Sequence, residues 1–257
     1  MNKKLVYSFY ASENTIGDEV NRIHIACLKK YIDIFDSVIF TIIKDKNCKD
    51  ETVANIEREI LSIRGIRPIS FNIIPNNEFR ESKVFYDEIA TRLGEDDLVF
   101  FAHNKGVSNV EKFDREVIYK WITAMYFYCL NFMDEVNDYL VNNKFYSYGA
   151  FLTHNEEEEK CNKYGWYYIG TFFWVNSKKI YNFIKNQNIE LPKLCDRFYD
   201  EEFLGNIYES WPLLFTASHE NRYLKNCKNY YRNADIYLSC LYEDISDFNE
   251  FYNEIIK

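Results

Sequence analysis

The feature that most constrains this chain is a regular alternation of strand-like and helix-like segments over roughly its first hundred residues. Short β-rich runs are followed by stretches in which apolar residues recur every three or four positions. Four strands are expected, at Leu5–Tyr10, Ser37–Ile43, Ile69–Ile74 and Leu98–Ala102, with amphipathic helices between them. This alternation predicts an α/β fold of the Rossmann type, with a mostly parallel sheet flanked by helices.

Beyond the fourth strand the pattern becomes less regular. We expect a long helix over Arg115–Leu140, followed by strands at Phe145–Thr153 and Tyr167–Val175. Ser177 is suited to cap a short helix over Lys178–Lys185, and an amphipathic helix is expected near the end of the chain. No linker rich in Pro, Gly or Ser interrupts the chain, which favours a single domain over 1–257.

Composition and charge exclude several classes of protein. A net charge of −9 argues against a nucleic-acid binder, which needs a basic face. The sequence contains no apolar segment long enough to cross a bilayer and no secretory signal pattern. Its seven cysteines are scattered without a CxxC pair, so neither a zinc knuckle nor a redox motif is indicated. We therefore expect a cytoplasmic protein without a transmembrane segment, and peripheral membrane association stays open.

Polar residues follow the first and fourth expected strands, and in parallel sheets ligands bind beyond these strand ends. The candidates are Ser8, Tyr10 and Ser12 after the first strand, and His103, Asn104, Lys105 and Gly106 after the fourth. Lys105 is suited to neutralise a diphosphate, Gly106 to let the backbone approach it, and His103 to bind a metal or a phosphate oxygen. From spacing alone, a hydrogen-bonded strand end with a solvated lysine is the simpler interpretation. No GxGxxG or GxxxxGK[ST] motif follows any strand, which counts against a classical dinucleotide fold and a P-loop.

Several segments between about residues 95 and 210 together resemble one family. In order along the chain they are His103-Asn104-Lys105-Gly106-Val107-Ser108, Trp121 with Met125-Tyr126-Phe127, Tyr148-Gly149-Ala150, Gly170-Thr171-Phe172-Phe173-Trp174-Val175, and the acidic segment Asp196–Asn206. This ordered set is similar to a group of bacterial and viral glycosyltransferase-like proteins related to enzymes of capsule and rhamnan-type polysaccharide synthesis. Ordered co-occurrence is far more specific than any single motif.

The resemblance implies a GT-A-like fold that holds a UDP-, GDP- or dTDP-linked sugar at the carboxyl edge of the sheet. Residues 1–110 would then form the nucleotide-binding half and 111–257 the half that binds a glycan or lipid-linked glycan acceptor. Ser8, Tyr10 and Ser12 lie where GT-A enzymes receive the nucleobase. Many GT-A enzymes have an Asp-x-Asp metal motif at the place of His103, but here Asp96-Asp97 precedes the strand. Dependence on a divalent cation such as Mn²⁺ or Mg²⁺ therefore stays open, with His103 and His219 as the candidate ligands.

Candidates for proton transfer and for acceptor binding lie in the second half of the chain. Asp200, Glu201 and Glu202 offer a carboxylate base for the acceptor hydroxyl, with Glu202 or Glu201 preferred. Alternatively, these acids complement the dipole of a helix start. Trp174, Trp166 and Tyr167 are candidates for stacking on a sugar, although core packing explains Trp174 equally well.

Two other functions remain as alternatives to glycosyl transfer. A non-catalytic carbohydrate- or nucleotide-binding module on the same fold is favoured by the missing Asp-x-Asp. A nucleotidyltransferase is a weaker alternative, since it ordinarily needs a glycine-rich phosphate loop and a metal-binding carboxylate pair.

Overall fold

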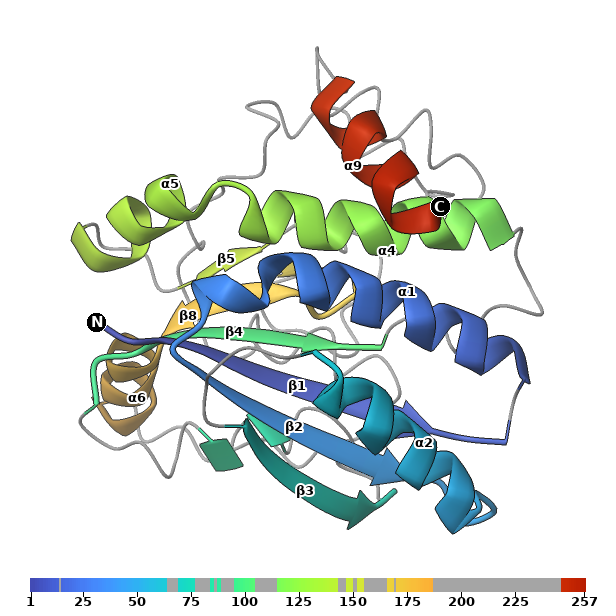
Figure 1. Ribbon diagram of the computed structural model, residues 1–257. Coiled ribbons are helices and arrows are strands. Elements are labelled where there is room, and N and C mark those ends of the chain that lie inside the picture. The colour runs from blue at the N-terminus through green and yellow to red at the C-terminus, as the bar shows by residue number, and fades with distance from the viewer. Residues whose placement is uncertain are drawn as a thin grey trace.

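A computed structural model (Figure 1) describes residues 1–13, 15–63, 69–76, 84–85, 87–88, 95–104, 115–142, 147–149, 152–154, 166–168, 170–186 and 246–257. Its helices are α1 (Thr15–Tyr31), α2 (Asp50–Leu61), α4 (Arg115–Leu130), α5 (Met133–Asn137), α6 (Ser177–Asn186) and α9 (Ser246–Ile256). Its strands are β1 (Lys3–Ala11), β2 (Ser37–Lys44), β3 (Ile69–Pro75), β4 (Leu98–His103), β5 (Ser147–Gly149), β6 (Leu152–His154), β7 (Trp166–Tyr168) and β8 (Phe173–Asn176). None of the helices in these residues is both long and apolar enough to cross a membrane.

Within these residues, six strands form one sheet in the order β3-β2-β1-β4-β8-β5, and β6 pairs with β7 separately. The strands β3, β2, β1 and β4 are parallel, whereas β8 runs antiparallel to both β4 and β5. The four strands expected from the sequence are present, with helices α1 and α2 in the first two connections. The prediction of an α/β fold with a mostly parallel sheet flanked by helices is confirmed.

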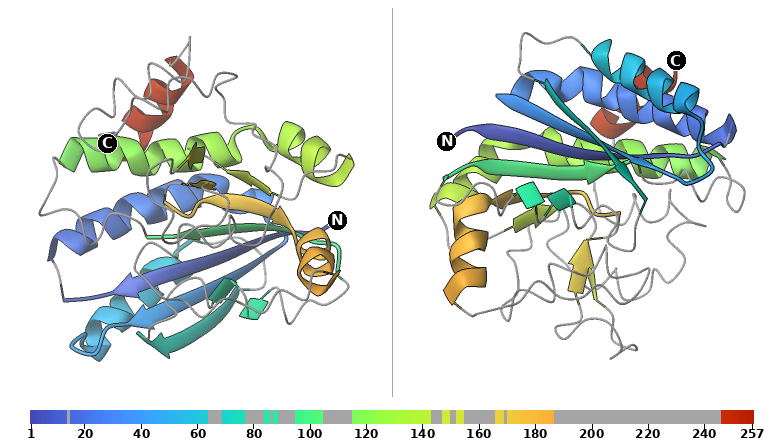
Figure 2. Two further views of the ribbon diagram at one scale, coloured as in Figure 1. Left: turned by 180° about the vertical axis from the view of Figure 1, so that it is seen from behind. Right: turned by 90° about the horizontal axis from the view of Figure 1, so that it is seen from below.

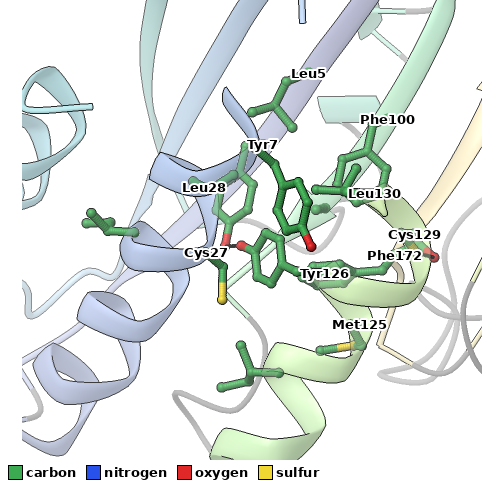
Figure 3. Packing of buried hydrophobic residues seen from close by; sticks show 14 of the residues in the cluster. Leu5, Tyr7, Cys27, Leu28, Phe100, Met125, Tyr126, Cys129, Leu130 and Phe172 are labelled. Atoms are coloured by element: carbon green, nitrogen blue, oxygen red, sulfur yellow. Dashed lines mark hydrogen bonds between the residues drawn. The ribbon is translucent and has the colours of Figure 1, made fainter. Parts of the chain in front are cut away.

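The two faces of the sheet bury different sets of side chains, because successive residues of a strand point to opposite sides. On one face, Tyr7, Phe40 and Phe100 join a core cluster with apolar residues of α1, α2, α4 and α9. Figure 3 shows part of this cluster, with Tyr7 and Phe100 beside residues of α1 and α4. On the other face, the rings of Phe101 and Phe173 pack within 5.5 Å of each other, and Phe85 contacts both. Figure 2 shows α6 on this second side, away from α1 and α4.

A polar cluster lies inside the first core, between β1, α1 and α4. The Tyr7 and Tyr126 hydroxyls each lie 3.0 Å from His24 Nδ1, and the Tyr126 hydroxyl donates to that of Tyr7. All three side chains are buried, and burial raises the pKa of both tyrosines well above the ordinary value. Because the three groups bond to one another, the cluster ties the two helices to the central strand without leaving its hydroxyls unpaired.

The long helix expected over Arg115–Leu140 ends at Leu130 and is followed by α5 and a π-helical turn. The reason lies at the last carbonyls of α4. The carbonyl oxygen of Tyr128 accepts from the Tyr148 hydroxyl at 2.7 Å, and that of Cys129 accepts from Trp174 Nε1 at 2.8 Å. These side-chain donors occupy carbonyls that the backbone amides of a continuing helix would need.

The two long strands expected in the second half are each divided in two. Phe145–Thr153 gives β5 and β6, which belong to different sheets, and Tyr167–Val175 gives β7 and β8. The second division coincides with Gly170 and Thr171, whose φ angles are +88° and +59°. Such angles turn the chain out of an extended conformation.

The cap of α6 is also one residue earlier than expected. Asn176 Oδ1 accepts from the backbone amide of Lys179 at 2.9 Å, so Asn176 is the capping residue. Ser177 instead donates its hydroxyl hydrogen to the Glu95 carbonyl and accepts from the Asp97 amide. Its side chain therefore ties α6 to the segment before β4.

The amino edge of the sheet contains a buried ion pair. Lys4 Nζ lies 3.2 Å from Asp97 Oδ2, and only 6% of Lys4 and 4% of Asp97 is exposed. Glu95 lies 4.0 Å from the same ammonium group but is largely exposed. The Lys4 ammonium is buried away from water, so the Asp97 carboxylate provides its neutralising charge. A buried charge is costly when it loses such a partner.

We expect Asp97→Ala to lower the free energy of unfolding by about 3 kcal/mol, because the buried Lys4 ammonium then keeps only the more distant, exposed Glu95 as a partner. Urea denaturation measures the change, with Glu95→Gln as the control that removes an exposed carboxylate from the same lysine. The double variant Lys4→Met/Asp97→Ala should recover part of the loss. Equal, small effects of Asp97→Ala and Glu95→Gln would contradict this account of the pair.

Candidate functional site

The candidate site lies where the order of the sheet reverses. The chain runs from β1 to β2 and β3 on one side, and then returns to place β4 on the other side of β1. In open α/β sheets, ligands bind in the crevice outside the carboxyl ends of the strands at this point. Ser8 of β1 is the register partner of His103 of β4. The structure thus brings together the two segments, after the first and fourth strands, that the sequence singled out separately.

Ser8 has an unusual environment at this position. It is 1% exposed, and its hydroxyl has no hydrogen-bond partner among the described residues. Thr41 of β2 and His103 of β4 are its register partners, so the three side chains share one face of the sheet. Because the flanking Tyr7 and Phe9 belong to the core under α1 and α4, this is the opposite face. A buried unpaired hydroxyl is uncommon and costly, and among the described residues the Tyr31 hydroxyl of α1 shares this property. Ser8 differs because it lies at the reversal of the sheet, where a ligand would give its hydroxyl a polar partner.

His103 connects the end of β4 to the turn before β8. Its Nε2 donates to the carbonyl oxygen of Gly170 at 2.9 Å, and its side chain is almost fully buried. The same turn is closed by a bond from the Thr171 amide to the Tyr168 carbonyl at 3.2 Å. Thr171 is a buried non-glycine residue at φ +59°, a strained conformation of the kind that clusters at functional sites.

The glycine in this turn is required by both its conformation and its surroundings. Gly170 has a φ of +88°, as at the third position of a type II turn. A Cβ atom there would lie 2.5 Å from Met125 Sδ of α4. The turn that receives His103 is therefore packed directly against α4.

Asn104 links the ends of β1 and β4. Its backbone amide donates to the Ser8 carbonyl at 3.2 Å. Its side-chain Oδ1 accepts from the Tyr10 amide at 2.8 Å, and Nδ2 donates to the Tyr10 carbonyl at 3.0 Å and to Asn21 Oδ1 at 2.8 Å. Both amide hydrogens are thus used within the protein. Asn104, expected among the donor-binding residues, acts on the site by positioning Tyr10.

Tyr10 bonds to a residue that the sequence analysis missed. The Tyr10 hydroxyl donates to Asp45 Oδ2 at 2.6 Å, and the Asn47 amide donates to Oδ1 at 3.0 Å. The hydrogen bond from Tyr10 is the main reason that the pKa of Asp45 lies below its ordinary value. Asp45 directly follows β2, so the rule that selected polar residues after β1 and β4 would have found it after β2 as well.

The segment after β1 continues through Ser12, which is partly exposed, to Glu13. Glu13 Oε1 accepts from the Lys49 amide at 2.8 Å and from the Thr52 hydroxyl at 2.7 Å. The bonds from Thr52 and then from the Lys49 amide lower the pKa of Glu13 from 4.5 to about 2. The loop after β1 is therefore attached to the start of α2.

Trp174 lies in the core and not on a surface. It is fully buried and stacks on Phe35 with ring centroids 5.6 Å apart, and its Nε1 donates to Cys129. Of the two roles that the sequence left open for Trp174, its burial fits core packing. We therefore do not assign Trp174 to acceptor binding. Trp166 and Tyr167 lie in β7. The other predicted residues fall outside the described residues: Lys105, Gly106, Asp200, Glu201, Glu202 and His219.

Within the described ranges, no three His, Cys, Asp or Glu side chains gather in a way that would hold a metal ion. Comparison of the chain with protein-family models gives no match, and neither does comparison with curated proteins.

We expect Asn104→Asp to lower the free energy of unfolding by about 2 kcal/mol, because a carboxylate there faces the Tyr10 carbonyl and loses both donors. Chemical denaturation measures the change. Asn55→Asp, on the exposed side of α2, makes the same substitution without buried partners and should change stability by less than about 0.5 kcal/mol. Similar values for the two variants would show that the Asn104 bonds do not hold the strand ends together.

The contribution of Glu13 to stability should depend on pH. Because its pKa falls from 4.5 to about 2 on folding, the contribution is complete above the unfolded value and is lost as the pH falls toward the folded one. Glu13→Gln should therefore lower the melting temperature near neutral pH, and its difference from the wild type should shrink steadily below pH 4.5. A difference independent of pH would exclude the ionised carboxylate as its source.

Proposed function

We propose that this chain is a glycosyltransferase with a GT-A-like fold, which transfers a sugar from a nucleoside-diphosphate donor to a glycan or lipid-linked glycan. The observation that carries the proposal is the buried Ser8 hydroxyl beside His103 at the reversal of the sheet, which has no hydrogen-bond partner in the part of the chain that the structure describes. A nucleotide donor bound at this edge would give that hydroxyl its missing partner. The family resemblance of the segments between about residues 95 and 210 points to the same chemistry.

The arrangement of the sheet supports this proposal. A wholly parallel sheet with a glycine-rich first turn would favour a dinucleotide fold, but here the antiparallel strand β8 follows β4. At the carboxyl edge, the Asp45 carboxylate bonds to Tyr10, the Asn47 amide and the Asn76 side chain, and its two oxygens offer about four acceptor positions. It can therefore accept from an N–H or hydroxyl group of a nucleoside.

The transfer itself needs three things from the protein. The acceptor hydroxyl must be held in line with the anomeric carbon, its proton must go to a base, and the charge of the departing diphosphate must be offset. The oxygen of the acceptor forms the new bond as the bond from the anomeric carbon to the diphosphate breaks. We assign the charge offset to Lys105 and proton removal to a carboxylate among Asp200, Glu201 and Glu202.

A non-catalytic binding module remains the second candidate, and the position of Asp97 favours it. Asp96-Asp97 is the only pair of adjacent aspartates in the sequence, and Asp97 is engaged with Lys4 at the opposite, amino edge of the sheet. Asp97 is therefore not placed to bind a donor metal. Incubation with donor alone separates the two functions, because an enzyme of this class slowly releases nucleoside diphosphate by hydrolysis and a pure binder releases none.

We expect Ser8→Ala to weaken binding of the stabilising nucleotide about 5-fold, because the ligand loses one hydrogen bond. The variant itself should be at least as stable as the wild type, since it loses no bond within the described residues and removes a buried unpaired hydroxyl. Thermal shift with UDP, GDP, CDP and dTDP, each with and without Mn²⁺, identifies the nucleotide, and titration of that nucleotide gives the affinity. Ser62→Ala, at the exposed end of α2, is the control.

Two results would count against the proposal. A flat response of the wild type across the four nucleotides would remove the basis for donor binding. Unchanged affinity in Ser8→Ala would move the site away from the reversal of the sheet.

A further inference from the structure

The loop after β1 is held against the second strand and helix at two separate places. The first lies at the strand end, where the Tyr10 hydroxyl donates to Asp45 and the Asp45 amide donates to the Ala11 carbonyl at 3.0 Å. The second lies at Glu13, two residues beyond the end of β1. Together they enclose the short segment that contains Ser12.

The Glu13 contact completes a helix start that lacks a cap of its own. Lys49 is the capping residue of α2, with extended backbone angles and no side-chain hydrogen bond to the helix. The Glu13 carboxylate, 36 residues earlier in the chain, supplies the missing acceptor. It accepts hydrogen bonds from the Lys49 amide and from the Thr52 hydroxyl. A carboxylate at a helix N-terminus is favoured by both the free amides and the helix dipole. Lys49 Nζ adds an ion pair at 3.4 Å, although that ammonium group is mostly exposed.

We propose that Glu13 is a positioning residue for the nucleoside end of the site: by capping α2 it fixes the loop that follows Tyr10 and so holds the Tyr10–Asp45 pair in its binding geometry. This inference rests on the proposed function, since it assigns the pair to donor binding. Glu13 itself need not touch the donor. It acts through the loop and through α2.

The loss of nucleotide affinity expected on replacing Glu13 is limited by the other contacts that hold Tyr10. Asn104 binds both the amide and the carbonyl of Tyr10, so the backbone of that residue keeps its place when Glu13 is removed. Three residues span at most about 10 Å, so release of Glu13 gives freedom mainly to the short segment after Ala11. The Tyr10 side chain, whose hydroxyl bonds to Asp45, is the part of Tyr10 that Asn104 does not hold. A moderate loss of affinity is therefore expected, with little loss of fold.

The test compares Glu13→Ala, Glu13→Gln and the control Glu51→Gln. Glu51 lies exposed in the first turn of α2, so its substitution makes the same change of charge at the same helix end. We expect Glu13→Ala to weaken binding of the nucleotide that stabilises the wild type, among UDP, GDP, CDP and dTDP, about 5-fold. Glu13→Gln keeps an acceptor oxygen and should recover part of this loss, while Glu51→Gln should bind as the wild type does.

Amide hydrogen exchange of the free proteins gives a second, ligand-independent measurement. In Glu13→Ala the amides of Lys49 and of Asp45, which donates to the Ala11 carbonyl, should exchange faster, while the amide of Tyr10, bonded to Asn104, should change less. Wild-type affinity in Glu13→Ala, or an equal loss in Glu51→Gln, would overturn the inference.

The two proposals fail in different ways. If the wild type binds none of the four nucleotides, the proposed function fails, and exchange alone then decides whether Glu13 holds the loop. Faster exchange at Lys49 and Asp45 in Glu13→Ala would support that positioning role, and unchanged exchange at both would overturn it.

Discussion

The pairing of β1 with β4 is the contact on which the rest of this structure depends. β1 lies between β2 and β4 and is parallel to both, so one strand sets the register of its two neighbours, and β3 is paired to β2. Its alternation sends Tyr7 and Phe9 into the core under α1 and α4, and sends Ser8 to the other face beside His103. A shift by one residue would exchange these two sets and bury the wrong face. The same pairing therefore determines both the core and the candidate site.

Much of the fold was predictable because it depends on local patterns. Runs of apolar residues indicated β1 to β4, and the helical spacing of Phe248 and Phe251 indicated α9. What the sequence did not reveal depends on partners far along the chain. The end of α4 is determined by donors from Tyr148 and Trp174, and the bond between Tyr10 and Asn104 joins residues 94 positions apart. Such contacts leave no periodic signal.

The sequence predicted where the candidate site lies better than it predicted what each of its residues does. Topology correctly directed attention to the strand ends, and Ser8 and His103 lie there. Asn104 was expected to bind a ligand but uses its amide within the protein, and Asp45 was missed although it follows a strand in the same way. The sequence shows which polar residues follow the strands at the carboxyl edge of the sheet. Whether such a residue already has its hydrogen bonds within the protein depends on partners distant in the sequence, which only the structure shows.

The two carboxylates described at this edge are both held by donors of the protein itself. The Asp45 carboxylate accepts from Tyr10 and Asn47, and the Glu13 carboxylate accepts from Lys49 and Thr52. Each carboxylate is thus stabilised by donors of the protein, as the lowered pKa of both groups reflects. We propose that this edge binds a nucleoside diphosphate, and amide NMR spectra recorded during titration with the four nucleotides test this directly. We expect shifts at Ser8, Tyr10, Asp45 and His103 and none at Lys4 or Asp97. Shifts confined to the amino edge, or none at all, would show that the nucleotide does not bind here.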